Sequence, residues 1–247
     1  MSVDAIDRLG RIHEHIRNEG RARVAELAVL LDVSEMTIRR DLDTLAEQGL
    51  LRRVRGGAMA IGPQPFADRF SRHARAKDRI VAKLLDLVGP AGAIGIDASS
   101  TLQRLAAAID PTVQLTVLTN GPDCFNALQE RPELTALLTG GQLDRRTGSL
   151  VGPLAVRTAQ DLSLDRLFVS AAGLDTNGTT EATLEEAEVK RALAEASAEV
   201  VAAVDHTKLG QRAPARCLAL RRIDVLVTDL DPDDQRLRPW RGRVKLV

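Results

Sequence analysis

Residues 32–55 read DVSEMTIRRDLDTLAEQGLLRRVR, and the pattern of this stretch decides the fold of the first domain. Ser34 favours a helix start, because its side-chain oxygen can accept a hydrogen bond from a free amide of the first turn. Apolar residues at i, i+4 and i+7 place one helix face against a core: Ile38, Leu42 and Leu45. Gly49 predicts the helix end, since glycine adopts the left-handed conformation at little cost.

A basic hairpin is predicted directly after this helix. Leu50–Val54 reads as a short strand, Gly56-Gly57 as a tight turn and Ala58–Ile61 as a return strand. This order indicates a module that reads duplex DNA, with the first turns of the helix in the major groove.

Polar and basic side chains lie on the outer face of the helix and on the hairpin. Thr37, Arg39 and Arg40 are expected near base edges, since arginine can pair with guanine and a threonine methyl can touch thymine. The hairpin arginines are expected on phosphates. The candidate DNA-binding residues are Ser34, Glu35, Met36, Thr37, Arg39, Arg40, Arg52, Arg53 and Arg55. The alternative is a small helical domain whose charged face only meets solvent.

Two further helices are predicted upstream. The first covers residues 4–19 and ends at Gly20. Its inward face carries Ile6, Leu9, Ile12 and Ile16. The second covers Val24–Leu31, and the turn Asp32-Val33 joins it to the Ser34 helix. We therefore predict a helix-turn-helix domain with a small β-wing over residues 1–61.

Length and composition narrow the class of protein. A chain of 247 residues favours two domains. Lys plus Arg and Asp plus Glu number 34 each, but Arg52–Arg79 holds eight basic residues against two acidic ones, a local excess of six. A clustered excess of this kind suits nucleic acid even at zero net charge. The scarcity of aromatic residues argues against base stacking on single strands.

Residues 62–73 contain two prolines and no sustained period, and are predicted to form a linker. Residues 74–247 then alternate apolar strands with helices, which favours an α/β domain with a mainly parallel sheet covered on both faces. The expected strands are 93–96, 113–118, 134–138, 166–170, 200–204 and 225–228. The expected helices are 74–88, 101–109, 123–130, 154–162 and 183–198.

Small polar residues follow several of these strands. Loops at the carboxyl ends of parallel strands meet at one edge of a sheet, where ligands bind in such folds. Hydroxyls and amides at a helix start suit an anion, so a small phosphorylated ligand fits. Each loop has an ordinary alternative: Ser99 or Thr101 as a helix cap, and Gly140-Gly141 as a turn.

Several motifs together resemble the DeoR family of bacterial transcriptional regulators. They are VSEMTIRRDLDTLAEQGLLRRVRGGA at 33–58, IDASSTLQRLA at 96–106, TVLTNGP at 116–122, LTGGQLDRRTGSLVGPLA at 138–155, and AAGLDTNGTT, EAEVKRAL and VDHTKLG within 171–210. The resemblance implies a winged helix-turn-helix joined to a sensor similar to ribose-5-phosphate isomerase. It implies a repressor of a sugar-catabolic operon that acts as a dimer or higher oligomer and is released from operator DNA by a phosphorylated sugar or related metabolite.

The resemblance also places an effector site. The candidate effector-binding residues are Asp97, Ser99, Ser100, Thr101, Asn120, Gly121, Gly140, Gly141, Asp175, Lys190, Asp205 and Lys208. On this assignment the effector phosphate lies on residues 99–101, and its hydroxyls lie on Asp97 and Asn120. Asp97 would repel a phosphate, so it must either face the polyol end or orient a backbone amide. Ser99 stands where the family usually has glycine, and its Cβ narrows the loop.

Other functions fit the sequence less well. A sugar-phosphate isomerase is the main alternative, with Asp175 and Lys190 as remnants of its site, but isomerisation needs a placed base and gives no use to the N-terminal domain. A pure protein-interaction adaptor leaves the helix arginines unexplained. The histidines form no ligand cluster, so no metal or cofactor is expected. The unpaired Cys124 and Cys217, with no signal peptide and no membrane span, predict a cytoplasmic protein.

Overall fold

The computed structural model describes residues 3–19, 21–60, 66–129, 131 and 133–247. Its internal contacts divide the chain into two compact units, Met1–Arg69 and Phe70–Val247, each described here by itself. The predicted helix stop at Gly20 and strand end at Ile61 lie outside the described residues.

The first unit contains the three predicted helices and the hairpin. Its elements are α1 (Val3–Glu19), β1 (Arg21–Arg23), α2 (Val24–Leu31), α3 (Glu35–Glu47), β2 (Leu51–Val54) and β3 (Gly57–Ala60). The core forms as the apolar spacing predicts, with Ile12, Ile16, Ile38 and Leu42 fully buried. β1 was not predicted, because three residues with two arginines carry no strand pattern; it pairs antiparallel with β3.

The ends of α3 follow from its sequence. The Ser34 side chain accepts the amide of Thr37 at 3.2 Å, which confirms the predicted cap. Gly49 adopts a φ of 70°, as the predicted stop requires. The hairpin turn differs by one residue from the prediction, because Gly57 pairs with Val54 inside the sheet. A side chain at Gly57 would overlap the carbonyl of Ala22 on β1, so close approach of β1 and β3 requires glycine there.

The second unit is built on a seven-stranded sheet with the order β15-β14-β12-β9-β4-β5-β6, in which every neighbouring pair is parallel. The strands are β4 (Ala91–Ile96), β5 (Gln114–Thr119), β6 (Thr135–Leu138), β9 (Leu164–Val169), β12 (Ser197–Ala203), β14 (Val225–Val227) and β15 (Lys245–Leu246). The six predicted strands are confirmed within a few residues. Only two-residue β15, too short to show a pattern, was missed.

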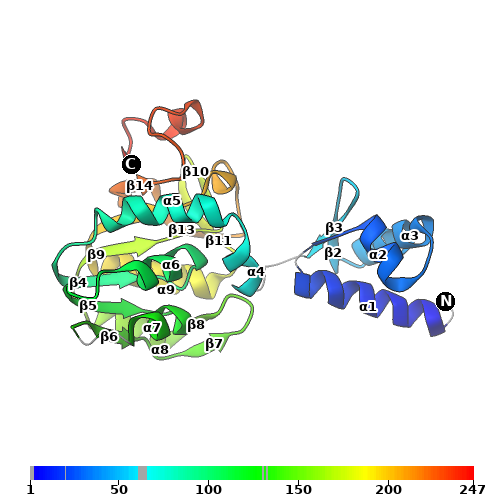
Figure 1. The fold of residues 1–247 in the computed structure, drawn as a ribbon, viewed down its shortest axis with the longest axis horizontal. Helices are drawn as coiled ribbons and strands as arrows, with labels where there is room; N and C mark the ends of the chain where they lie inside the picture. Colours follow the sequence, from blue (N-terminus) through cyan, green and yellow to red (C-terminus); the bar gives the residue numbers. More distant parts are fainter. Residues whose placement is uncertain (1–2, 20, 61–65, 130, 132) are drawn as a thin grey trace. The chain divides into compact units, whose positions relative to one another are not determined.

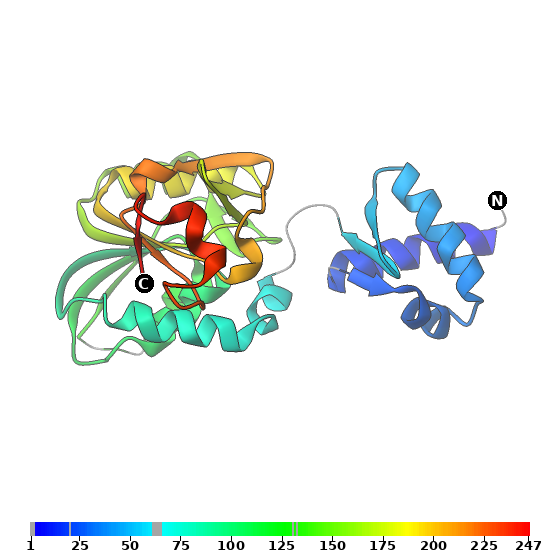
Figure 2. The same cartoon turned by 90° about the horizontal axis from the view of Figure 1, so that it is seen from above.

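Helices cover both faces of this sheet (Figure 1). Residues of α5 (Ala74–Leu85), α6 (Ser100–Ala108) and α7 (Pro122–Gln129) pack on one face, with Ile94 and Val117. Residues of α8 (Pro153–Gln160) and α9 (Leu184–Glu195) pack on the other, with Leu167 and Ala202. Figure 2 shows α5 (cyan) and α9 (yellow) on opposite sides of the strands. The predicted α/β architecture is therefore confirmed.

Short elements were not predicted. They are the hairpin β7 (Gln142–Asp144) and β8 (Ser149–Val151), the antiparallel sheet of β10 (Gly173–Asp175), β11 (Gly178–Glu181) and β13 (Ala215–Ala219), and the 3₁₀ turns His206–Lys208, Leu220–Arg222 and Gln235–Trp240. Strands of three to five residues with charged or hydroxyl side chains show no alternation, so their pairing is set by tertiary contacts.

Part of the predicted linker is helical. Phe66–Ser71 forms a short helix, α4, where the sequence shows no period. Six residues are too few to display a helical repeat. Contacts with α6 help to hold its end: the Arg104 guanidinium stacks 4.5 Å from the ring centre of Phe70 and donates to the Phe70 carbonyl at 3.1 Å.

Candidate functional sites

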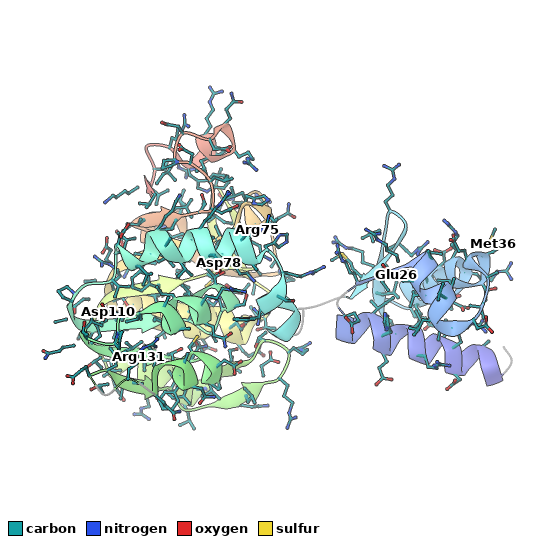
Figure 3. All side chains as sticks on the ribbon, viewed as in Figure 1. Glu26, Met36, Arg75, Asp78, Asp110 and Arg131 are labelled. Carbon is teal, nitrogen blue, oxygen red and sulfur yellow. The ribbon has the colours of Figure 1, made fainter. Side chains whose placement is uncertain are left out.

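The outer face of α3 is exposed along its first two turns. Met36, labelled in Figure 3, is 71% exposed. The hydroxyls of Ser34 and Thr37 lie 2.9 Å apart, and Arg39 pairs with Glu35 at 3.0 Å. Both members of that pair are about half exposed, and such pairs contribute at most about 1 kcal/mol, so DNA phosphates or bases can compete for Arg39. The Arg40 guanidinium makes no bond within the described part of the chain.

The hairpin arginines differ in their surroundings. Arg53 pairs with Asp43 at 2.8 Å and donates to the Gly57 carbonyl at 2.9 Å, so it also ties the hairpin to α3. Arg52 lies 3.0 Å from the Met59 sulfur. Arg55, in the turn, is exposed and has no partner among the residues described. Arg40 and Arg55 are therefore the arginines of this surface most available to DNA.

The loops after β4 and β5 are joined at the carboxyl edge of the sheet. The Asn120 side chain accepts the Ala98 amide at 3.0 Å and donates to the Leu150 carbonyl at 3.2 Å. A side chain on Gly121 would meet Ala98 at 2.8 Å, so this contact requires glycine. Asn120 thus joins residues 97–101 to the β7–β8 hairpin, and its amide is used inside the protein.

Asp97 belongs to a buried cluster of charges. It is fully buried, its carboxylate accepts the amides of Ser99 and Ser170 at 3.0 and 2.9 Å, and Lys190 lies 2.9 Å away. Lys190 also pairs with Glu181 at 2.7 Å. This geometry supports the second of the two roles considered for Asp97, the orientation of backbone amides.

Burial and neighbouring charges shift the pKa values of Lys190 and Glu181. Burial alone would lower the pKa of Lys190, but Asp97 and Glu181 outweigh it and hold that pKa well above its usual value. Burial raises the pKa of Glu181 to about 7, against the opposing effect of Lys190. A lysine locked between two carboxylates is a positioning group for the loops after β4 and β9.

The start of α6 holds the predicted phosphate loop. Ser99 is the cap, since its hydroxyl accepts the Leu102 amide at 3.2 Å; Thr101 lies inside the helix and does not cap it. The Ser100 hydroxyl accepts a hydrogen bond from the Lys77 ammonium at 2.9 Å. The sequence analysis missed Lys77. The available signal was its position three residues before Ile80, on the buried face of an amphipathic helix.

Gly140 and Gly141 lie exposed after β6. Gly141 has a φ of 125°, and a side chain there would meet the Val151 carbonyl at 2.5 Å. A side chain on Gly140 would reach the Leu154 Cβ at 3.4 Å. Gly141 therefore serves the turn into β7, and the pair leaves this part of the edge without side chains.

The later predicted residues have unequal roles. Asp175 closes the β10–β11 turn by accepting the Asn177 amide at 2.7 Å, and it pairs with Arg212 at 2.5 Å. Burial raises the pKa of Asp175, but the hydrogen bonds from Asn177 and Arg212 lower it by more. The pKa of Asp175 therefore lies below its usual value. Asp205 caps the following 3₁₀ turn by accepting the Thr207 amide at 2.9 Å. The ammonium of half-buried Lys208 makes no bond among the described residues, so it stays available, while the Lys208 backbone is held in the turn by the Asp205 carbonyl at 2.9 Å.

The described residues contain no group of three or more His, Cys, Asp or Glu that could hold a metal ion. Among these residues, too, no helix is both long and apolar enough to cross a membrane.

Sequence comparison covers both units. A model of the DeoR-like helix-turn-helix domain matches residues 8–64, and one of the DeoR C-terminal sensor domain matches residues 72–230. The chain is 34% identical to the HTH-type transcriptional regulator GolR of Listeria innocua, over 90% of each chain. It is 31% identical to the glycerol-3-phosphate regulon repressor of Escherichia coli, over 90% of this chain and 89% of that one. The L-fucose operon activator of Haemophilus influenzae is 33% identical, with 88% and 89% covered.

Solved structures are more distant. A ribose 5-phosphate isomerase from Methanocaldococcus jannaschii aligns with a TM-score of 0.41 at 12% identity, over 55% of this chain and 54% of that one. The delta subunit of eIF2B from Chaetomium thermophilum aligns with a TM-score of 0.48 at 12% identity, over 65% and 58%. Scores this low support no functional argument.

Proposed function

The chain belongs to the DeoR family of DNA-binding transcriptional regulators, and from this premise we propose that it represses a carbohydrate operon until a phosphorylated metabolite releases it. The observation that carries the proposal is the family match over both units. It agrees with the exposed basic surface of α3 and the hairpin in the first unit and with the polar edge of the sheet in the second. Such a repressor acts in the bacterial cytoplasm.

DNA recognition is assigned to α3 and the hairpin, with Ser34, Glu35, Met36 and Thr37 at the front of the helix. Arg40 is proposed to read a base, because its guanidinium is exposed and unengaged within the described chain. Arg39 contacts DNA after its ion pair with Glu35 breaks. Arg52 and Arg55 contact phosphate, while Arg53 mainly holds the hairpin on α3.

The effector is assigned to the carboxyl edge of the sheet. Its phosphate lies at the start of α6, near Ser100 and the Lys77 ammonium, with Lys208 as a second cation. One similar protein is named for glycerol 3-phosphate and another for L-fucose, which supports a small polyol or sugar derivative. Asp97, Asn120 and Lys190 hold the loops in shape, and Asp175 and Asp205 shape their own turns.

The structure offers a route from this site to the DNA-binding unit. Lys77 lies in the first turn of α5, just after α4, and it bonds to the phosphate loop through Ser100. Arg104 of α6 pairs with Asp78 of α5 at 2.9 Å and bonds to Phe70 of α4. A shift of α6 on effector binding therefore moves the segment that leads to the first unit.

Catalysis is not expected. Isomerisation needs a base that reaches substrate, whereas Asp97, Glu181 and Lys190 are buried and paired with one another.

Self-association is a further part of the proposal, because one winged domain buries too little DNA surface for operator affinity, and paired half-sites favour a dimer. Light scattering that finds only monomers, with and without DNA, would contradict this part.

Selection from a random duplex library tests DNA reading. The full chain should enrich one sequence with paired half-sites. On that duplex, Arg40→Ala should lose about 1–3 kcal/mol, with relaxed specificity at one base position. Arg238→Ala, which removes an arginine from the sensor unit, is the matched control. No enrichment, or equal affinity for Arg40→Ala and wild type, would reject the assignment.

A further inference from the structure

Thr139, the residue directly after β6, carries a hydroxyl that the protein leaves without a partner. The side chain is 2% exposed, and no hydrogen-bond partner lies within reach of its Oγ1 among the described residues. Its backbone amide is satisfied by the Thr119 carbonyl at 2.9 Å. The group without a hydrogen-bond partner is therefore the side-chain hydroxyl.

Two other buried threonine hydroxyls along the same edge have partners. Thr119 accepts the Gly121 amide at 3.0 Å, and Thr228, after β14, accepts the Leu230 amide at 3.2 Å. Buried polar groups in proteins are rarely left unpaired, and those that are call for an explanation such as a ligand or water. A valine would fill the space of Thr139 without the unpaired oxygen.

The position of Thr139 fits one end of the proposed effector. β4, β5 and β6 are consecutive in the sheet, so Thr139 lies about 10 Å across the edge from the loop after β4, twice the spacing of neighbouring strands. The loop after β5 lies between these two loops, and its Asn120 bonds to the Ala98 amide of the loop after β4. A three- to five-carbon phosphate bound at Ser100 spans this distance. Gly140 and Gly141, exposed and without side chains, directly follow Thr139.

We propose that Thr139 is a specificity-determining residue of the effector site, whose hydroxyl bonds to a hydroxyl on the polyol part of the phosphorylated effector. A hydroxyl both donates and accepts, so it suits an alcohol. The inference rests on the proposed function, since it takes the phosphate at the start of α6 as given.

Isothermal titration of the full-length protein tests this inference with three probes: inorganic phosphate, glycerol 3-phosphate and ribose 5-phosphate. Thr139→Val should bind phosphate as wild type does, and should bind the preferred polyol phosphate about fivefold to tenfold more weakly, the value of one hydrogen bond. Thr139→Ser keeps the hydroxyl and should stay within about threefold of wild type.

Melting temperatures separate a ligand contact from a structural bond. Thr139→Val should melt at or above the wild-type temperature, because it removes an unpaired buried oxygen. Thr228→Val, which loses a satisfied bond, should melt lower. A Thr139→Val protein destabilised like Thr228→Val would overturn the inference, since the hydroxyl would then have a partner in the free protein.

The affinities also distinguish the inference from the function on which it rests. Equal polyol-phosphate affinity in Thr139→Val and wild type, or an equal loss for phosphate and polyol phosphate, overturns the role of Thr139. A wild type that binds polyol phosphates no more tightly than phosphate also overturns it and leaves the phosphate loop intact. A wild type that binds none of the probes rejects the proposed function and the inference together.

Discussion

Replacing Lys190 by methionine should destabilise the sensor unit strongly. The ammonium lies 2.9 Å from Asp97 and 2.7 Å from Glu181, and all three side chains are at most 7% exposed. Removal of one partner from a buried ion pair typically costs about 3–5 kcal/mol. The lower end, about 3 kcal/mol, applies here, because Asp97 keeps two amide donors and Glu181 can take up a proton.

That loss translates into a clear thermal shift. A domain of this size loses about 2–4 °C of melting temperature per kcal/mol, so Lys190→Met should melt roughly 6–12 °C below wild type. Scanning calorimetry of the full chain measures it. Arg236→Met, which breaks the more exposed pair with Asp234, is the control and should shift melting far less than Lys190→Met.

A second substitution checks the cause. Adding Glu181→Leu to Lys190→Met should recover part of the loss, because an apolar side chain replaces a buried carboxyl that has lost its cation. Melting of Lys190→Met within about 2 °C of wild type would refute this reasoning, since Asp97 would then need no cation to stay buried.

Three further outcomes follow from the same contacts. Ser99→Ala should cost about 1 kcal/mol in urea unfolding, because the Leu102 amide loses its cap; an unchanged midpoint would place the cap elsewhere. Burial raises the pKa of Glu181 from 4.5 to about 7, so its protonated form contributes stability at low pH that is lost as the pH rises through 7. Glu181→Gln should therefore flatten the melting profile between about pH 5 and 7, and a profile parallel to wild type would contradict the shift. Arg104→Gln should bind operator and polyol phosphate normally but respond less to effector in anisotropy titrations, since it weakens the bond to Phe70; a full response would exclude this route.

The regular elements could be predicted because their residues carry local signals. α3 has a capping serine, a buried stripe and a glycine stop, and each acts within a few residues. The parallel strands are apolar on both faces, since helices cover both sides, and therefore stand out from the chain.

The remainder depends on residues far apart in sequence. Lys77 reaches Ser100 across 23 positions, and Asp97 reaches Lys190 across 93, so no local pattern reveals either contact. The candidate site shows the same limit. The sequence marked Asp97 and Asn120 as polar loop residues, but only the fold shows that both are buried and bonded inside the protein. Thr139 carries no sequence signal at all, because an unpaired hydroxyl is a property of its surroundings.

The most direct test of the regulatory mechanism is operator affinity of the full-length protein as a function of polyol-phosphate concentration, measured by fluorescence anisotropy on the selected duplex. The coupling of two sites in one protein is typically about 1–3 kcal/mol and is reciprocal. We predict that glycerol 3-phosphate or ribose 5-phosphate weakens operator binding by about fivefold to 150-fold, and that operator weakens binding of the same compound equally. Operator affinity that stays constant at concentrations where the compound saturates the protein would contradict the account.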